Sequence, residues 1–106
     1  MNKRTKALSI TWNTKEKVWK RQHGRSLYSG KPISVSECCC HFIPRSKGGL
    51  GIEENIIGLT YEEHMIFDNN LIGSHLAESK LIEKKAREHL MKNYENWDES
   101  KLIWRK

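Results

Sequence analysis

The stretch that organises this chain is CHFIPRSKGGLGIEENIIGLTYEEHMIFD, residues 40–68. It opens with residues typical of a strand and continues through a glycine-rich loop at 46–51. Thr60 and Glu63 then have the spacing of a capping box, in which each side chain bonds the other residue's backbone N–H. The pattern therefore predicts a strand, a loop and a helix over 61–69.

Three side chains in this stretch are candidate ligands for one divalent metal ion. His64 and Asp68 are four positions apart, which places them on one face of the predicted helix. Cys40, from the strand, would complete a three-ligand site with positions left open for water and a phosphate oxygen. The ion would be Mg²⁺, Mn²⁺, Ni²⁺ or Zn²⁺, and a thiolate ligand favours zinc over magnesium.

His41 is the candidate general base. Neighbouring side chains on a strand point in opposite directions, so a metal-facing Cys40 would leave His41 free to face a scissile phosphate. A neutral histidine can activate water for phosphodiester hydrolysis, while a cation neutralises the phosphate. Arg45 either stabilises the transition state at that phosphate or is a solvated loop arginine.

Three states of Cys40 are compatible with the sequence. Cys40 binds zinc or another transition metal; or it does not bind, and His64 and Asp68 hold the ion with Glu37; or the site is impaired. Cys38 and Cys39 are interpreted as core residues, which is the usual role of cysteines on a buried strand.

The ordered residues resemble the motif of the HNH endonuclease family over about residues 22–69. The motif positions fall on His41, Pro44, Gly48-Gly49, Asn55 and His64. Cys40 departs from the motif, because an Asp or His is usual at that position.

The resemblance implies an α+β fold of the ββα-metal type, in which a helix crosses a two-stranded hairpin with the ion between them; the residue pattern adds N-terminal and C-terminal helices that flank this core. It implies a small phage-type nuclease that cuts DNA with His41 as base and His64 and Asp68 as ligands. Asn55 would belong to the catalytic group by bracing the loop that aims His41. The alternatives are an impaired module that binds nucleic acid or a partner, and a structural zinc protein in which Cys38–Cys40 and His64 close the site.

The segments around the motif are expected to support it. Residues 1–11 are predicted to form a mobile basic arm with a short strand over 7–12, and residues 12–106 a single domain. Its further predicted elements are a helix over 15–23 capped by Thr14, a hairpin over 33–43, a helix over 75–94 capped by Ser74 within the supporting segment 74–106, and a strand or packed tail over 101–105.

The charge distribution favours a polyanionic partner. The 106 residues carry a net charge of +6, and Glu16 is the only acid among the first 25 residues, beside eight basic residues. DNA is therefore the predicted partner, with a larger phage or nucleic-acid-processing complex as a further one. The predicted nucleic-acid contacts are Lys17, Lys20, Arg21, Arg25 and Lys47. The polar N-terminus, the lack of a long apolar run and three adjacent cysteines predict a cytoplasmic protein without a membrane span.

Overall fold

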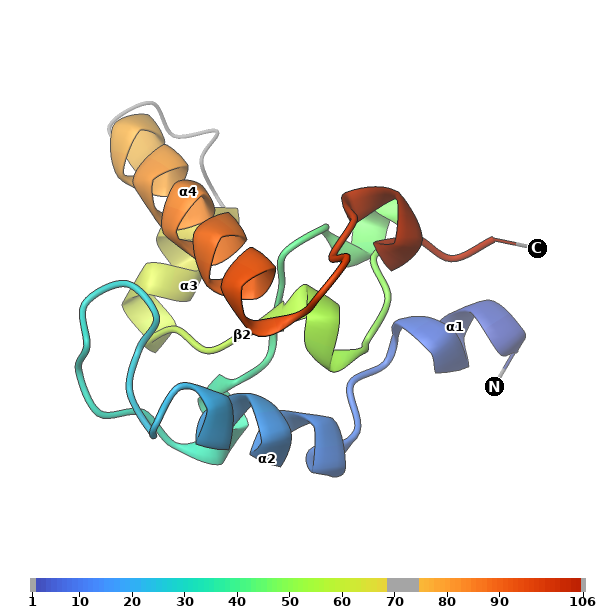
Figure 1. Ribbon diagram of the computed structural model, residues 1–106, viewed down its shortest axis with the longest axis horizontal. Helices are drawn as coiled ribbons and strands as arrows, with labels where there is room; N and C mark the ends of the chain where they lie inside the picture. Colours follow the sequence, from blue (N-terminus) through green and yellow to red (C-terminus); the bar gives the residue numbers. More distant parts are fainter. Residues whose placement is uncertain (1, 69–74, 106) are drawn as a thin grey trace.

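The computed structural model describes residues 2–68 and 75–105 and confirms the α+β class (Figure 1). The elements in chain order are α1 (Lys3–Leu8), α2 (Trp12–Arg21), the 3₁₀ turn η1 (Val35–Glu37), β1 (Cys40–His41), η2 (Arg45–Lys47), η3 (Glu53–Asn55), β2 (Ile56–Ile57), α3 (Tyr61–Asp68), α4 (Leu76–Asn93) and η5 (Glu99–Leu102).

A short antiparallel hairpin lies at the centre of the fold. Cys40 pairs with Ile57 and His41 with Ile56, so β1 and β2 enclose a loop of residues 42–55. The hairpin predicted over 33–43 is wrong, because 35–37 form η1 and the partner of β1 comes from farther along the chain.

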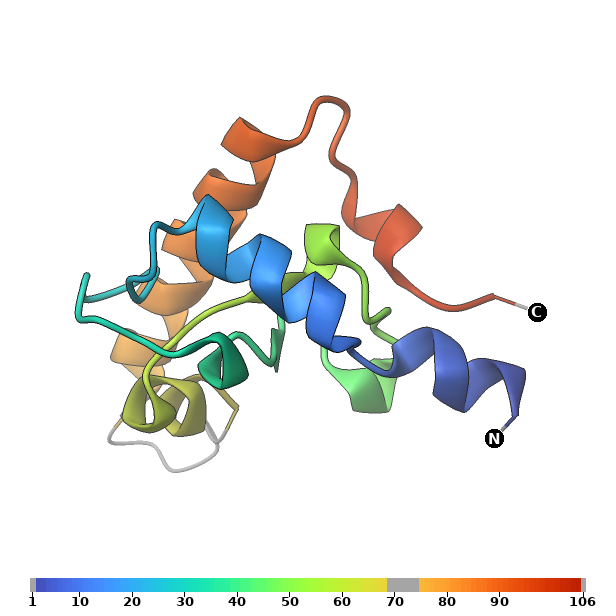
Figure 2. The same cartoon turned by 90° about the horizontal axis from the view of Figure 1, so that it is seen from below.

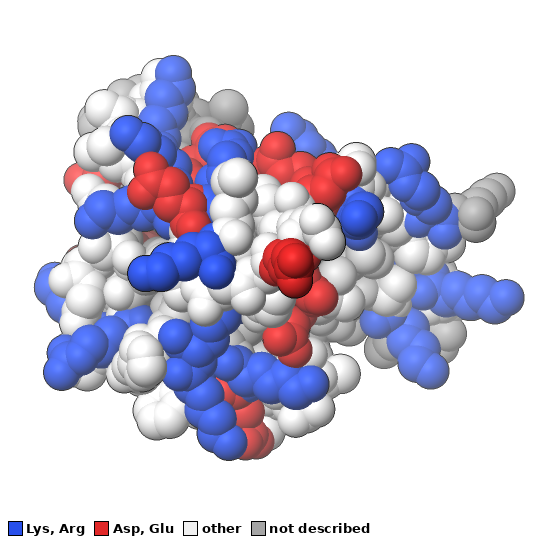
Figure 3. All heavy atoms as spheres, in the orientation of Figure 1, with Lys and Arg blue, Asp and Glu red and all other residues white. Residues whose placement is uncertain are grey.

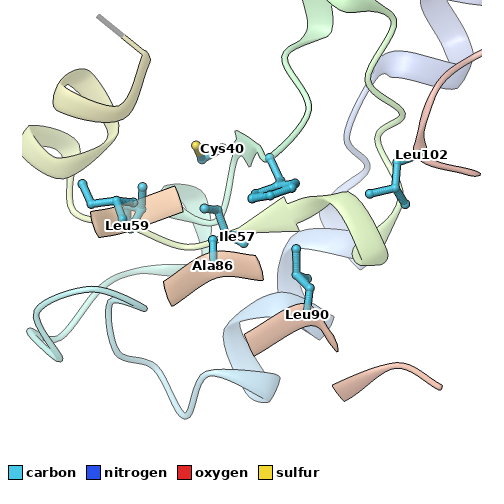
Figure 4. Close-up of a cluster of buried hydrophobic side chains, with 8 residues drawn as sticks. Cys40, Ile57, Leu59, Ala86, Leu90 and Leu102 are labelled. Atoms are coloured by element: carbon cyan, nitrogen blue, oxygen red, sulfur yellow. The ribbon is translucent and has the colours of Figure 1, made fainter. Parts of the chain in front are cut away.

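The two faces of the hairpin belong to two separate cores. Cys40 and Ile57 pack with buried residues of α4, whereas Ile56 packs with Val18 of α2 and with Ile33. Figure 1 shows α3 and α4 on one side of the hairpin and α2 on the other. Figure 4 shows Cys40 in the α4 cluster, with its sulfur on the side of α3. A two-residue strand pair is thus stabilised by burial on both faces rather than by its own hydrogen bonds.

The helices after the hairpin confirm the predicted periodicity. Thr60 Oγ1 accepts from Glu63 N at 3.2 Å and Glu63 Oε1 accepts from Thr60 N at 3.0 Å, which is the predicted capping box of α3. Ile82, Ala86 and Leu90 of α4 are buried. The predicted cap of α4, Ser74, lies outside the described residues.

The N-terminal region differs from the prediction. Residues 3–8 form α1 and residue 12 begins α2, so the strand predicted over 7–12 is wrong. The predicted arm is instead docked, because Leu8 is 1% exposed and Ala7 O accepts from Gly51 N at 2.9 Å. Helix α1 and the segment that follows η5 lie at the same end of the molecule in Figures 1 and 2.

Helix α2 begins earlier than predicted. Thr11 Oγ1 accepts from Thr14 N at 3.1 Å, so Thr11 and not Thr14 is the cap. At the other end of the chain, Leu102 is buried in η5 and Trp104 N donates to Gly48 O at 2.8 Å, which holds the predicted tail against the loop. Across the described residues, none of the helices combines the length and apolar character needed to cross a bilayer.

Candidate functional site

The three predicted metal ligands come together in the structure. Cys40 Sγ of β1 and the side-chain ligand atoms of His64 and Asp68 on α3 all lie within 4.8 Å of one another. His64 and Asp68 are on one helical face, and Cys40 meets them because α3 follows β2 directly. A sulfur, a nitrogen and an oxygen donor at this separation fit Zn²⁺ or another borderline transition metal better than Mg²⁺.

His64 is the centre of this cluster. Its Nε2 lies 2.8 Å from Asp68 Oδ2, and its Nδ1 lies 3.9 Å from Cys39 Sγ. The hydrogen bond to Asp68, followed by those to Cys39 and Cys40, raises the pKa of His64 to about 12. Without a cation His64 therefore holds a proton, and metal binding at this group requires the release of that proton.

Cys40 is the most deeply buried member of the cluster. Its side chain is 0% exposed, and this burial raises the pKa of the thiol to about 11. Ionisation of Cys40 then depends on a nearby positive charge, as on a metal or on protonated His64.

Two other residues differ from their predicted places. Cys39, interpreted as core, is half-buried and lies against His64. The sequence signal that could have predicted this contact was the position of Cys39 next to the candidate ligand Cys40. Glu37, one alternative ligand, instead accepts from Ser34 N at 2.9 Å in the capping box of η1.

His41 lies beside the metal-ligand cluster: Cys40 Sγ donates to His41 O at 3.9 Å, and the His41 ring itself bonds elsewhere. His41, His64, Asp68 and Arg45 all line one cleft of about 700 Å³. The Nε2 atom of His41 is 2.8 Å from Leu8 O. Burial lowers the pKa of His41, and the hydrogen bond to Leu8 opposes this effect only partly, so the ring is neutral near pH 7.

Asn55 braces the loop that carries this cleft. It is 0% exposed; its Oδ1 accepts from Ile43 N at 2.8 Å, and its Nδ2 donates to Leu50 O at 2.9 Å and to Ile43 O at 3.2 Å. The backbone of Gly49 packs against the backbone of Ile43, where an added Cβ would lie 1.7 Å from Ile43 O. The hydrogen bonds of the Asn55 amide thus hold the backbone after His41 in one conformation, and glycine at position 49 leaves room for this close approach.

Basic and acidic side chains both line the cleft. Arg45 and Lys47 are its basic lining residues, and Glu83 and Glu99 are among its acidic ones. Arg87 Nη2 lies 3.1 Å from Glu83 Oε1 and 3.0 Å from Glu99 Oε1, which offsets part of the acidic charge facing the cleft.

The predicted nucleic-acid contacts are divided by the fold. Lys47 lines the cleft, whereas Lys17, Lys20 and Arg25 do not. Lys17 lies 3.5 Å from Glu53, and Arg25 donates to Gly30 O at 3.1 Å. Figure 3, in the orientation of Figure 1, shows Lys and Arg side chains spread over the visible face of the molecule rather than gathered into one patch.

The guanidinium of Arg21, a predicted phosphate contact, is bonded inside the fold rather than directed to solvent from the outer face of α2. Its guanidinium donates to His89 Nε2 at 2.8 Å and to Tyr94 OH at 2.9 Å. It also donates to the backbone oxygens of Glu53 at 2.8 Å and Ile56 at 2.7 Å. Arg21 therefore ties α2 to the hairpin and to α4, which sequence periodicity could not reveal.

No protein-family model, curated protein or solved structure matches this chain.

Proposed function

We propose that this protein is a metal-dependent endonuclease of the HNH type that hydrolyses phosphodiester bonds in DNA. The observation that carries the proposal is the cluster of Cys40, His64 and Asp68 within 4.8 Å, next to a cleft that also holds His41 and Arg45. The order of the elements, two strands followed by a helix, also supports it.

Each side chain has a distinct task in this proposal. His41 is neutral and accepts a proton from the attacking water. Arg45 and Lys47 attract the phosphate and offset its negative charge. A divalent cation held by His64 and Asp68, with Cys40, would neutralise the scissile phosphate and the leaving oxygen. Asn55 keeps the loop in place and takes no part in proton transfer.

One observation favours a second candidate, an impaired module that binds nucleic acid or a protein partner in a larger phage or nucleic-acid-processing complex. Cys40 is fully buried, and its thiol has a pKa of about 11. A thiol that ionises reluctantly is a weak ligand for hard cations such as Mg²⁺.

Plasmid nicking in the presence of Mg²⁺, Mn²⁺, Ni²⁺ or Zn²⁺ tests the proposal. At least one ion is expected to support cleavage, and His41→Ala should lower the rate by about 10²- to 10⁴-fold while metal binding and the circular dichroism spectrum stay unchanged. His75→Ala is the matched control, because His75 is exposed and lies outside the cleft.

The other outcomes identify the alternatives. DNA binding without cleavage by any ion would support the impaired module. Unfolding on metal removal, with no effect of His41→Ala, would support a structural metal site.

A further inference from the structure

The N-terminal segment 3–9 is fixed against the loop of the hairpin. Leu8 is 1% exposed, and Ala7 O accepts from Gly51 N at 2.9 Å. The approach is so close that an added Cβ at Gly51 would lie 2.1 Å from Ser9 O. A backbone position without space for any side chain marks a specific docking contact rather than a loose arm.

This docked segment contacts the candidate base directly. His41 Nε2 lies 2.8 Å from Leu8 O. A carbonyl oxygen can only accept a hydrogen bond, so Nε2 carries the hydrogen and the lone pair of the neutral ring is on Nδ1. The contact joins residues 33 positions apart, and it holds the neutral ring in the Nε2–H tautomer.

We propose that segment 3–9 is a working part of the active site, in which the Leu8 carbonyl positions His41 so that Nδ1 is the nitrogen that accepts the proton. This inference rests on the proposed nuclease function. In the reaction, Nδ1 takes one proton from water, and the water oxygen forms a bond to phosphorus. The bond from phosphorus to the leaving sugar oxygen breaks, and that oxygen takes a proton from solvent.

The segment also carries positive charge. The effect of this charge on DNA binding must be separated from the effect of the Leu8 carbonyl on His41. Lys3, Arg4 and Lys6 of α1 are exposed and available to DNA phosphates. Gly51→Ala displaces the carbonyl but keeps these charges. The triple variant Lys3→Gln, Arg4→Gln, Lys6→Gln removes the charges but keeps the carbonyl.

The tautomer of His41 is measured first, by ¹⁵N NMR of the imidazole in the wild-type full chain without metal. The expected spectrum is that of an Nε2–H ring, assigned by comparison with His41→Ala. Gly51→Ala should give a mixture of both tautomers. A wild-type ring protonated on Nδ1 would overturn the proposal.

Cleavage kinetics provide the second test. Gly51→Ala should lower kcat by roughly tenfold to a hundredfold with little change in KM, as a small misplacement of a catalytic group does. The triple variant should raise KM and leave kcat unchanged. Leu8→Ala loosens the same anchor by truncating a buried side chain, so it should lower kcat as Gly51→Ala does, but by less. If Gly51→Ala does not fold, Leu8→Ala takes its place in the test.

The outcomes separate this proposal from the nuclease assignment. If the wild type cuts DNA and folded Gly51→Ala or Leu8→Ala keeps both kcat and the Nε2–H tautomer, the positioning role is rejected and the nuclease stands. If no ion supports cleavage by the wild type, the nuclease assignment fails, and the NMR spectrum alone decides whether Leu8 sets the tautomer.

Discussion

Two groups of arginine and histidine lie beside the hairpin, Arg21 with His89 and Arg45 with His41 and His64. They differ in whether the arginine donates its hydrogen bonds within the fold. Arg21 donates to four acceptors on three parts of the chain, among them His89. Arg45 lies with His41 and His64 along the open cleft, and within the described residues its guanidinium has no hydrogen-bond or ion-pair partner.

The difference distinguishes a charge that is bonded within the fold from a charge that is available to a ligand. Arg21 has its donors satisfied inside the fold, so its positive charge stabilises the arrangement of α2, β2 and α4. Arg45 has donors available to an external anion, which is what a phosphate-binding group requires. Both residues are basic, Arg45 within the motif and Arg21 just before it, and their partners in the fold show how each charge is used.

The largest expected effect on stability comes from Arg21→Ala. Removing one side of this network leaves the oxygens of Glu53 and Ile56 without their partner, and the free energy of unfolding should fall by about 3 kcal/mol. Urea denaturation followed by tryptophan fluorescence measures it. Lys20→Ala, on the exposed side of α2, is the control and should change stability by less than about 0.5 kcal/mol. A loss for Arg21→Ala as small as that of the control would show that the network is not structural.

Arg45→Ala should have the opposite profile. Its cleavage rate should fall by roughly 10²-fold, the scale of losing one donor to a charged transition state, which corresponds to about 2.7 kcal/mol. The free energy of unfolding should change by less than about 0.5 kcal/mol. Plasmid nicking and denaturation measure the two effects, with the exposed Lys80→Ala as control. Full activity of Arg45→Ala would remove Arg45 from the proposed mechanism.

The Arg21 group also predicts a pH dependence of stability. Burial, together with the charges of Arg21 and Lys92, lowers the pKa of His89 to about 4 from its ordinary 6.5. Between pH 6.5 and pH 4 the unfolded chain binds a proton at His89 that the folded chain does not bind. The contribution of neutral His89 to the free energy of unfolding is therefore fully present above pH 6.5 and is lost as the pH falls toward 4.

His89→Gln tests this pH dependence, because Gln keeps an acceptor for Arg21 but does not titrate. The wild type should lose about 2 kcal/mol more stability than His89→Gln between pH 7 and pH 4, after discounting for the solvent access of the half-buried ring. Denaturation curves at both pH values measure the difference. Equal losses in the two proteins would contradict a neutral His89 in the fold.

A smaller effect is expected from Cys40→Asp on the cleft side. A carboxylate suits Mg²⁺ better than a buried thiol does, so magnesium-supported nicking should rise by about tenfold, or about 1.4 kcal/mol. The rate is measured with Mg²⁺ and with Zn²⁺ on both proteins, with Cys38→Ser as the control for loss of a buried thiol outside the cluster. Unchanged or lower activity with Mg²⁺ would mean that Cys40 does not weaken the site.

Part of the candidate site was predictable because its geometry is local. The i,i+4 spacing of His64 and Asp68 and the capping box of Thr60 and Glu63 depend on one helical turn each, and both occur in the structure. The bracing of the loop by Asn55 also agrees with what the motif implied. Sequence alone thus determined the helix of the site and the residues offered to a metal.

Tertiary structure decided the contacts between distant segments. The partner of β1 lies in residues 56–57. The sequence could not reveal this pairing, because a two-residue strand has too little pattern to specify its register and depends on burial of both faces. The docking of residues 3–9 against His41 and the inward turn of Arg21 follow from such packing as well. A charged or short segment has the same sequence signature whether it is solvated or bonded inside the fold, and only the groups that surround it determine which state has the lower free energy.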